Sequence, residues 1–202
     1  MSLAVWLLAA LPLAAPPKLL VNAQLDTRSA AAGLESEFRS LLSAQPQPAW
    51  IAYTIPVIRG TSLGCEYVSP EGRSVPGVVH LEPPDHAVIL FRVEAGAVNR
   101  IRALSPDCEI DGRGVPVHWL DDVQPPESTT LLASFATVSK DPARLRNSAI
   151  GALSVSSDPG ALDLLIRLAR TDTDRRVRQQ CVSALARSRD PRAMTFLEGL
   201  LK

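Results

Sequence analysis

The last third of the chain repeats one pattern at a fixed offset of 32 residues. Nine positions agree in size and polarity: Ala149, Ile150, Ala152, Leu153, Asp158, Pro159, Ala161, Leu165 and Leu168 correspond to Cys181, Val182, Ala184, Leu185, Asp190, Pro191, Ala193, Leu197 and Leu200. A period of this length is typical of stacked helix pairs, because a single pair cannot bury its apolar stripe without a neighbour. The pattern therefore predicts helical repeats in this part of the chain.

Helix start signals recur within the repeat. Asp141, Asp158 and Asp190 are each followed by proline, and Asp174 precedes another segment of helical periodicity. Aspartate at an N-cap accepts a hydrogen bond from the first turn, and proline fits the first helical position, where its missing N–H is not needed. Together with a helix over 127–138, these signals predict five helices over 127–202, with Asp158 and Asp190 as structural residues of the repeat.

The middle of the chain has the composition of strands. Residues 50–58 are rich in β-branched and aromatic side chains, and a second strand is expected near 77–81. A hairpin is predicted from 86–93 and 97–104, followed by a short strand over 115–120. The sequence thus predicts a small antiparallel β domain over 49–122.

Two linking segments flank the expected β domain. Before it, residues 24–48 are predicted to form an N-terminal helix, from Ser29 to Leu42, and a linker. After it, Gln124, Pro125 and Pro126 are expected to form a hinge. The predicted fold class is α+β, with the β unit followed by a short α-solenoid.

The three cysteines fall into two groups. Cys65 and Cys108 lie in turn-rich sequence of the β region, where they could close one loop, and we expect them to form a structural disulfide. Cys181 occupies the repeat position of Ala149, which predicts a small buried packing residue.

The first 20 residues are nearly all apolar, with no charge before Lys18. Prolines interrupt this stretch, which suits a secretory signal better than a membrane-spanning helix. The small residues Val21 and Ala23 predict a signal peptide over 1–23, cleaved after Ala23, and a periplasmic or secreted protein. The alternatives are cleavage after Ala15, which Pro16 disfavours, an uncleaved membrane anchor, and an incorrectly assigned start.

The second copy of the repeat resembles a known family. The run from Asp174 to Leu185, followed by Asp190-Pro191 and an amphipathic helix, is similar to HEAT repeats of the phycobilisome-lyase-like type, and Asp141 to Leu168 matches less closely. The resemblance implies a curved solenoid of HEAT-like helix pairs that presents a concave surface to a protein partner. It also implies that Arg146 and Arg178 are structural arginines that bond toward neighbouring turns.

The same family contains bilin lyase subunits and a di-iron hydroxylase with His-Glu pairs on its helices. Residues 140–202 contain no histidine and only Glu198, which excludes the di-iron site. We therefore expect no cofactor. Two repeats are few for a stable stack, and Leu197, Leu200 and Leu201 have no following repeat, so the C-terminal helix could form a homodimer or mark a shortened relative.

One catalytic motif occurs in the β region. Residues 60–64 match the G-x-S-x-G nucleophile pattern with Ser62, and Asp107 or Asp111 followed by His118 would complete a triad. The motif needs a helix directly after the serine, whereas the sequence predicts a strand fragment and a turn. We favour a plain loop and keep a small hydrolase or lyase as the alternative function.

The sequence evidence for a metal site is equally weak. His80, Glu82, Asp85 and His86 lie close in sequence, but no spacing of four ligands recurs elsewhere. We expect these residues to be exposed polar side chains beside the hairpin, and we expect no metal.

Charge is distributed unevenly although the net charge is zero. Residues 140–202 hold 12 Lys or Arg against 7 Asp or Glu. An arginine-rich surface suits phosphates, carboxylates or acidic protein surfaces. We expect a protein partner that could be acidic, with Arg167 and Arg170 at the binding face, unless the arginines are simply solvated. Export, neutral charge and the lack of interleaved aromatics disfavour nucleic acid. The sequence thus favours a non-enzymatic, exported scaffold or adaptor.

Overall fold

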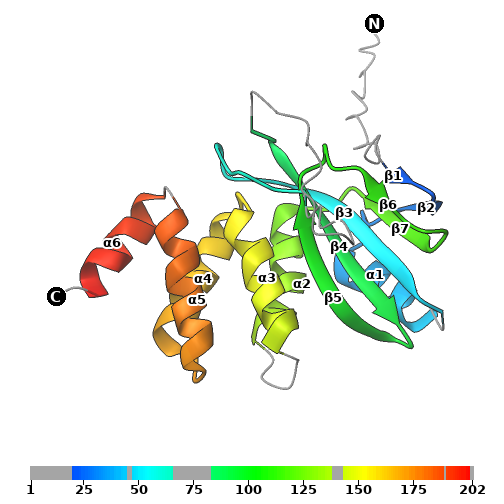
Figure 1. The fold of residues 1–202 in the computed structure, drawn as a ribbon. Helices are drawn as coiled ribbons and strands as arrows, with labels where there is room; N and C mark the ends of the chain where they lie inside the picture. Colours follow the sequence, from blue (N-terminus) through cyan, green and yellow to red (C-terminus); the bar gives the residue numbers. More distant parts are fainter. Residues whose placement is uncertain (1–19, 45–46, 66–82, 138–142, 189, 201–202) are drawn as a thin grey trace, which may run out of the picture.

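The computed structural model describes residues 20–44, 47–65, 83–137, 143–188 and 190–200. A mixed β-sheet with helices on one face occupies one half of the molecule, and the remaining helices stack beside it (Figure 1). This arrangement confirms the predicted α+β class.

The described part of the chain contains seven strands and six helices. The strands are β1 (Leu20–Val21), β2 (Gln24–Ser29), β3 (Ala49–Pro56), β4 (His86–Glu94), β5 (Ala97–Leu104), β6 (Ile110–Asp111) and β7 (Pro116–Asp121). The helices are α1 (Leu34–Ala44), α2 (Pro125–Thr137), α3 (Ala143–Val155), α4 (Pro159–Thr171), α5 (Arg175–Arg187) and α6 (Pro191–Leu200). The main sheet has the order β2-β7-β3-β4-β5, and β1 pairs with β6.

The expectation of an antiparallel β unit is wrong for half of the sheet. The strands β3, β4 and β5 are antiparallel, as predicted, but β2 and β3 both pair in parallel with β7. The strand β2 lies in the segment expected to be a helix and linker, and α1 begins at Leu34 rather than Ser29. All six residues of β2 are exposed, so this edge strand has no apolar alternation by which sequence could reveal it.

The segment just before β2 is also part of the fold. The N–H groups of Gly112 and Gly114 donate to the carbonyls of Val21 and Asn22, at 2.9 and 2.6 Å. A Cβ atom on Gly112 would lie 2.7 Å from the Cβ of Ala23, so the close approach requires glycine there. Cleavage after Ala23 would therefore remove a strand that the domain uses.

The two faces of the sheet belong to different hydrophobic clusters. On the helix side, Tyr53 and Phe91 pack with Phe38 of α1, and the Tyr53 hydroxyl lies 2.9 Å from that of Ser128 in α2. Burial raises the pKa of Tyr53 well above its ordinary value. On the opposite face, Trp119 packs in a smaller cluster with Cys108.

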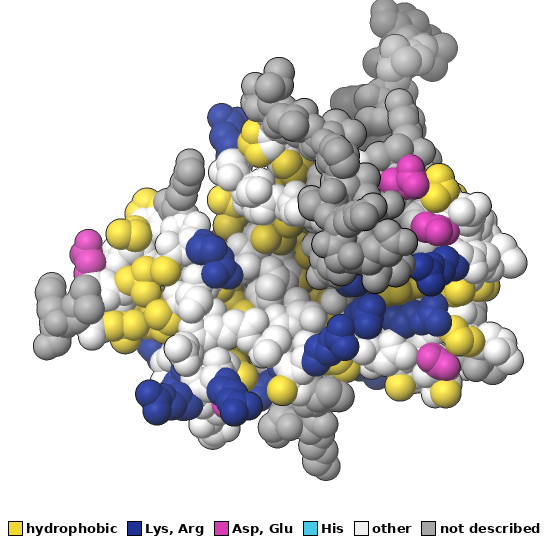
Figure 2. Space-filling model, viewed as in Figure 1, with side chains coloured by type: hydrophobic (Ala, Val, Ile, Leu, Met, Phe, Trp, Pro, Cys, Tyr) yellow, Lys and Arg dark blue, Asp and Glu magenta, His cyan; other side chains and the backbone are white. Residues whose placement is uncertain are grey.

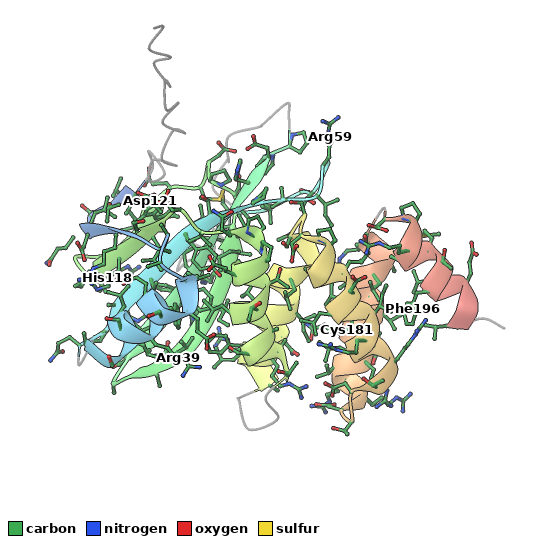
Figure 3. All side chains as sticks on the ribbon, turned by 180° about the vertical axis from the view of Figure 1, so that it is seen from behind. Arg39, Arg59, His118, Asp121, Cys181 and Phe196 are labelled. Atoms are coloured by element: carbon green, nitrogen blue, oxygen red, sulfur yellow. A yellow bond between two sulfur atoms is a disulfide. The ribbon has the colours of Figure 1, made fainter. Side chains whose placement is uncertain are left out.

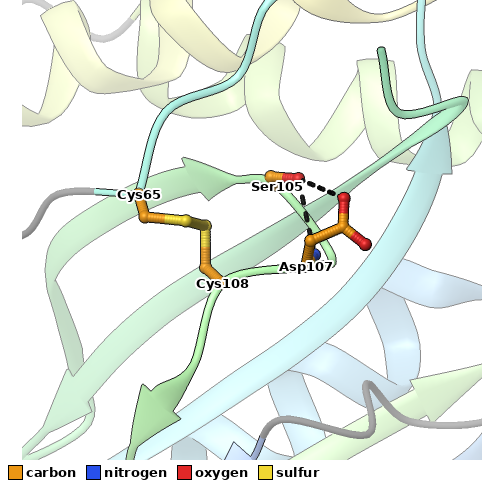
Figure 4. The surroundings of a disulfide bond; sticks show 4 residues. All are labelled: Cys65, Ser105, Asp107 and Cys108. Atoms are coloured by element: carbon orange, nitrogen blue, oxygen red, sulfur yellow. Dashed lines mark hydrogen bonds between the residues drawn. A yellow bond between two sulfur atoms is a disulfide. The ribbon is translucent and has the colours of Figure 1, made fainter. Parts of the chain in front are cut away.

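The predicted disulfide joins Cys65 to Cys108, with their Cα atoms 5.3 Å apart (Figure 4). Cys108 lies in the turn that follows β5, where Ser105 donates its hydroxyl to Asp107 at 3.1 Å. In the loop-entropy model, closing a loop with a sequence separation of 43 stabilises the fold by about 4 kcal/mol.

The expected hinge is instead the first turn of α2, which begins at Pro125. Because Ser128 and Leu132 of this helix are buried against the sheet side, the helices cannot swing about the prolines. One continuous cluster of buried side chains extends from Leu34 in α1 to Phe196 in α6. The sheet and the repeats therefore share a core.

The repeats form two helix layers. Helix α3 contacts α5, while α4 contacts both α2 and α6. Equivalent positions are buried in both copies, including Ala149 and Cys181, and Leu153 and Leu185. The predicted helix pairs are thus present, although two pairs do not establish the curvature of a solenoid.

The aspartates at the helix starts behave differently from one another. Asp174 and Asp190 each accept a hydrogen bond from an N–H in the first turn, from Arg176 and Arg192 respectively, both at 2.8 Å. Asp158 has the extended N-cap backbone, but its side chain forms no cap bond. Asp141 lies outside the described residues.

Arg146 connects three helices at the centre of the repeats. Its Nε donates to the carbonyl of Ala136 in α2 at 3.1 Å, and its Nη2 lies 2.7 Å from the Asp172 carboxylate after α4. The two side chains are only 7% and 9% exposed. Arg178 of α5 donates to the carbonyls of Asp172 and Thr173. Both repeat arginines therefore bond to carbonyl groups near the end of a preceding helix.

We predict that Arg146→Met lowers the free energy of unfolding by about 3–5 kcal/mol, because it leaves the Asp172 carboxylate buried without its cation. Arg144→Met removes an exposed arginine from the same helix and should change it by about 0.5 kcal/mol or less. Urea denaturation measures both values. Equal losses in the two variants would contradict the structural role of Arg146.

We also predict that the native, oxidised protein resists thiol alkylation. Cys181 is fully buried, and burial raises the pKa of its thiol to about 11, with the Asp172 charge adding to the shift. Intact mass after iodoacetamide at pH 8 should show no adduct in the native state, one in denaturant, and three in denaturant with reductant. Rapid native labelling would contradict the packing of Cys181.

Candidate interaction surface

Three neighbouring elements carry arginines and no acidic residue. The strand β5 and the helices α3 and α5 contain Arg100, Arg102, Arg144, Arg146, Arg175, Arg176, Arg178 and Arg187, and no Asp or Glu. The helix α3 contacts both β5 and α5, so the three elements form one continuous region. Figure 2 looks onto this region, which we call the basic face, and shows Lys and Arg side chains over both the helices and the sheet.

The helical part of the basic face repeats at the same offset as the core. Five exposed or half-buried positions on α3 correspond at this offset to five on α5: Arg144, Asn147, Ser148, Gly151 and Ser154 match Arg176, Gln179, Gln180, Ser183 and Ala186. Most of these side chains are small or neutral. Gln180 also ties the two helices together, because its Nε2 donates to the carbonyl of Asn147 at 2.8 Å.

The sheet part of the basic face brings like charges together. Arg100 on β5 lies directly opposite Arg92 on β4, and Arg92 stacks over the Trp50 ring at 5.6 Å. Like charges opposite each other destabilise a strand pair, which a bound anion would relieve. This arrangement indicates a surface suited to negative charge.

A loop from the sheet is fixed onto the helical end of the basic face. After β3, the N–H of Ile58 donates to the carbonyl of Val155 at 3.0 Å, and Val57 forms a β-bridge with Ser156. The N–H of Ser157 donates to the Pro56 carbonyl. The Gly60 loop, residues 57–65, therefore runs over the C-terminal end of α3.

A pocket of about 240 Å³ lies under this loop. Its walls are residues 58–62 of the loop, Ser154 and Val155 of α3, and Ala184, Arg187 and Ser188 at the end of α5. We call it the junction pocket, because it lies where the sheet unit meets both repeats.

The proposed nucleophile Ser62 lines this pocket, but the other members of a triad do not. Among the described residues, none that lines the pocket is His, Asp or Glu. His118 lies on β7 beside Ile51, and its Nδ1 is 3.1 Å from Asp26. In Figure 3 His118 lies at the far end of the molecule from the repeats. The geometry therefore does not assemble the hydrolase triad considered from sequence.

The residues around His118 form an ordinary ionic contact. Hydrogen bonds from Arg28 and then from His118 lower the pKa of the Asp26 carboxyl below its usual value. Nearby, burial raises the pKa of Asp121, which accepts a hydrogen bond from the indole of Trp119 at 3.1 Å. These groups stabilise the β7 region and do not face the junction pocket.

The weak metal candidate is only partly described. His86 lies 2.8 Å from Asp85, while His80 and Glu82 lie outside the described residues. Within the described part of the chain, no three His, Cys, Asp or Glu side chains gather as a metal site would require. In the same part, no helix is long and apolar enough to cross a membrane.

Arg167 and Arg170, the predicted binding residues, lie exposed on α4, in the helix layer that does not contribute to the basic face. Arg170 stacks over Phe196 of α6 at 5.1 Å. The C-terminal helix exposes Met194 and Leu200, at 49% and 54%. Binding through α4 and a homodimer through α6 stay predictions.

Sequence reasoning missed the basic face and the junction pocket for a shared reason. Both depend on contacts between segments far apart in the chain, such as β5 with α3 and Ile58 with Val155. One signal was available in the sequence. The helices α3 and α5, which occupy equivalent positions in the two repeats, both lack acidic residues, whereas α4 and α6 contain Asp163 and Glu198 respectively.

Comparison with known protein families supports the helical repeat predicted from the sequence. The family model described as HEAT repeats matches residues 99–186 and 136–202, together about half of the chain. The first match also spans β5 to β7, where the structure has strands. No curated protein and no solved structure matches the chain. HEAT repeats commonly mediate binding between proteins and are generally not enzymes. By the extent of the match and by its stacked helix pairs, the chain belongs to the HEAT-repeat family.

Proposed function

We propose that this protein is a non-enzymatic scaffold or adaptor that binds an acidic protein partner through its basic face. The observation that carries the proposal is the absence of acidic residues from three adjoining elements that hold seven arginines besides the buried Arg146. A partner with surface carboxylates would gain favourable contacts with the arginines across this face. Stacked helical repeats, to which the HEAT repeats of this chain belong, present extended binding surfaces.

The shape of the helical stripes supports the same proposal. Small side chains on α3 and α5, such as Ser148, Gly151 and Ser183, let a partner approach the helix backbones closely. Exposed arginines stand at the ends of these stripes, at Arg144 and Arg176 on one side and Arg187 on the other. Shape and charge together favour an extended acidic segment lying along the helices.

We also propose that the protein acts outside the cytoplasm. The apolar N-terminal stretch and the disulfide between Cys65 and Cys108 both support export, because structural disulfides persist in oxidising compartments. Because Leu20–Val21 forms β1, an exported chain that keeps this strand would have to be cleaved before Leu20.

The binding face can be tested by photo-crosslinking. A photoreactive amino acid at Ser148 or Ser183, in the centre of the basic face, should give a discrete crosslinked product in the native host, whereas the same group at Arg167 on α4 should not. Mass spectrometry identifies the product. Crosslinking from Arg167 alone would move the binding face to the other helix layer, and no product from any position would contradict the scaffold proposal.

Export can be tested by the mass of the native chain. Protein purified from the envelope fraction should have lost its N-terminal residues and retained Leu20, Val21 and Asn22, since these pair with the β6 region. A chain that starts at Gln24 would support export and show that β1 is dispensable. A full-length chain in the soluble cytoplasmic fraction would contradict export.

A further inference from the structure

We infer that the junction pocket binds a carboxylate of the acidic partner segment, and that Arg187 is its principal anchor. This inference rests on the proposed function and specifies where on the basic face one acidic group is held. The proposed ligand is a carboxylate group of a polypeptide.

The described residues that line the pocket include several hydrogen-bond donors and no acidic side chain. Arg187 lines the pocket at the end of α5, and neither Arg187 nor Arg59 of the loop forms an ion pair with another residue in the described part of the chain. Several other arginines there are already engaged: Arg146 with Asp172, and Arg192 with Asp163 and Asp190. Arg187 is therefore available to a ligand, and its planar fork fits a carboxylate with two parallel hydrogen bonds.

Hydroxyl groups complete the lining. Thr61 and Ser154 donate to carbonyls of their own segments, at Ile58 and Gly151 respectively. The Ser62 hydroxyl has no hydrogen-bond partner among the described residues, and Ser188 only accepts, from the N–H of Asp190. Ser62 and Ser188 can thus each donate a proton to a bound oxygen.

The helix ends beside the pocket would ordinarily repel an anion, because the last carbonyls of a helix carry partial negative charge. Here several of them are already bonded. The carbonyl of Val155 accepts from Ile58, and the carbonyls of Ala184 and Leu185 accept from the N–H of Ser188. This bonding removes part of the repulsion that an entering carboxylate would meet.

The pocket wall is held in place from both sides. Backbone hydrogen bonds to α3 anchor the start of the Gly60 loop, and the disulfide from Cys65 to Cys108 anchors its end. Arg59 projects from the tip of the loop, away from the helices (Figure 3), so it attracts an acidic segment without filling the pocket. A fixed wall lowers the entropic cost of binding.

The test uses full-length protein and a fluorescein-labelled hexaglutamate peptide with an amidated C-terminus, followed by fluorescence anisotropy. Arg187→Gln should weaken binding by about five-fold or more, the effect of losing one guanidinium–carboxylate contact. Arg167→Gln is the matched control, since it removes the same charge from an exposed helix position outside the pocket, and it should change the affinity by about two-fold or less. Circular dichroism checks that each variant is folded.

Three results would overturn the inference: no binding by the wild-type protein, equal losses in Arg187→Gln and Arg167→Gln, or stronger competition by inorganic phosphate than by acetate at equal ionic strength. The same peptide with a free C-terminus separates the sources of the carboxylate. Tighter binding of that peptide assigns the pocket to a chain terminus, and equal binding assigns it to glutamate side chains. If the crosslinked partner from Ser148 is retained in Arg187→Gln at unchanged affinity, the pocket assignment fails while the scaffold proposal stands.

Discussion

The buried pair of Arg146 and Asp172 holds the repeats in register. Arg146 also donates to the end of α2, and Asp172 accepts the N–H of Asp174, which caps α5. One ion pair thus connects the helix beside the sheet, the first repeat and the start of the second. Because a buried charge without its partner is costly, this contact selects a single arrangement of four helices. The position of the basic face follows from that arrangement, in which α3 and α5 lie side by side.

The sheet unit and the repeats depend on each other. Two repeats bury little apolar surface on their own, and here the sheet, α1 and α2 cover the near end of the stack. In return α3 packs along β5, an edge strand whose backbone groups would otherwise lie open to pairing with another chain. The shared core explains why the prolines at the start of α2 do not act as a hinge.

Local patterns predicted local structure well. The hairpin of β4 and β5, the repeat helices and the disulfide were all visible in sequence, because each depends on periodicity, turn residues or cysteine context. The strand β2 was not, because its residues are exposed and polar and it forms through pairing with β7, about ninety positions away. Parallel pairing of β7 with β3 likewise depends on long-range topology. The candidate site was predicted only as a tendency toward basic charge. The proposed site on α3 and α5 lies in a different helix layer from Arg167 and Arg170, and the sequence does not show how these layers stack.

The disulfide lies in the sheet unit, yet one of its cysteines ends the loop that covers the repeats. Breaking the bond would remove the covalent anchor at one end of the loop that forms the wall of the junction pocket, while its backbone contacts with α3 would remain at the other end. The shape of a surface made largely by helices is thereby linked to the redox state of a bond outside them. Under the proposed export and binding role, a newly made chain would acquire the fixed form of this loop only after oxidation, in a compartment where the bond can form.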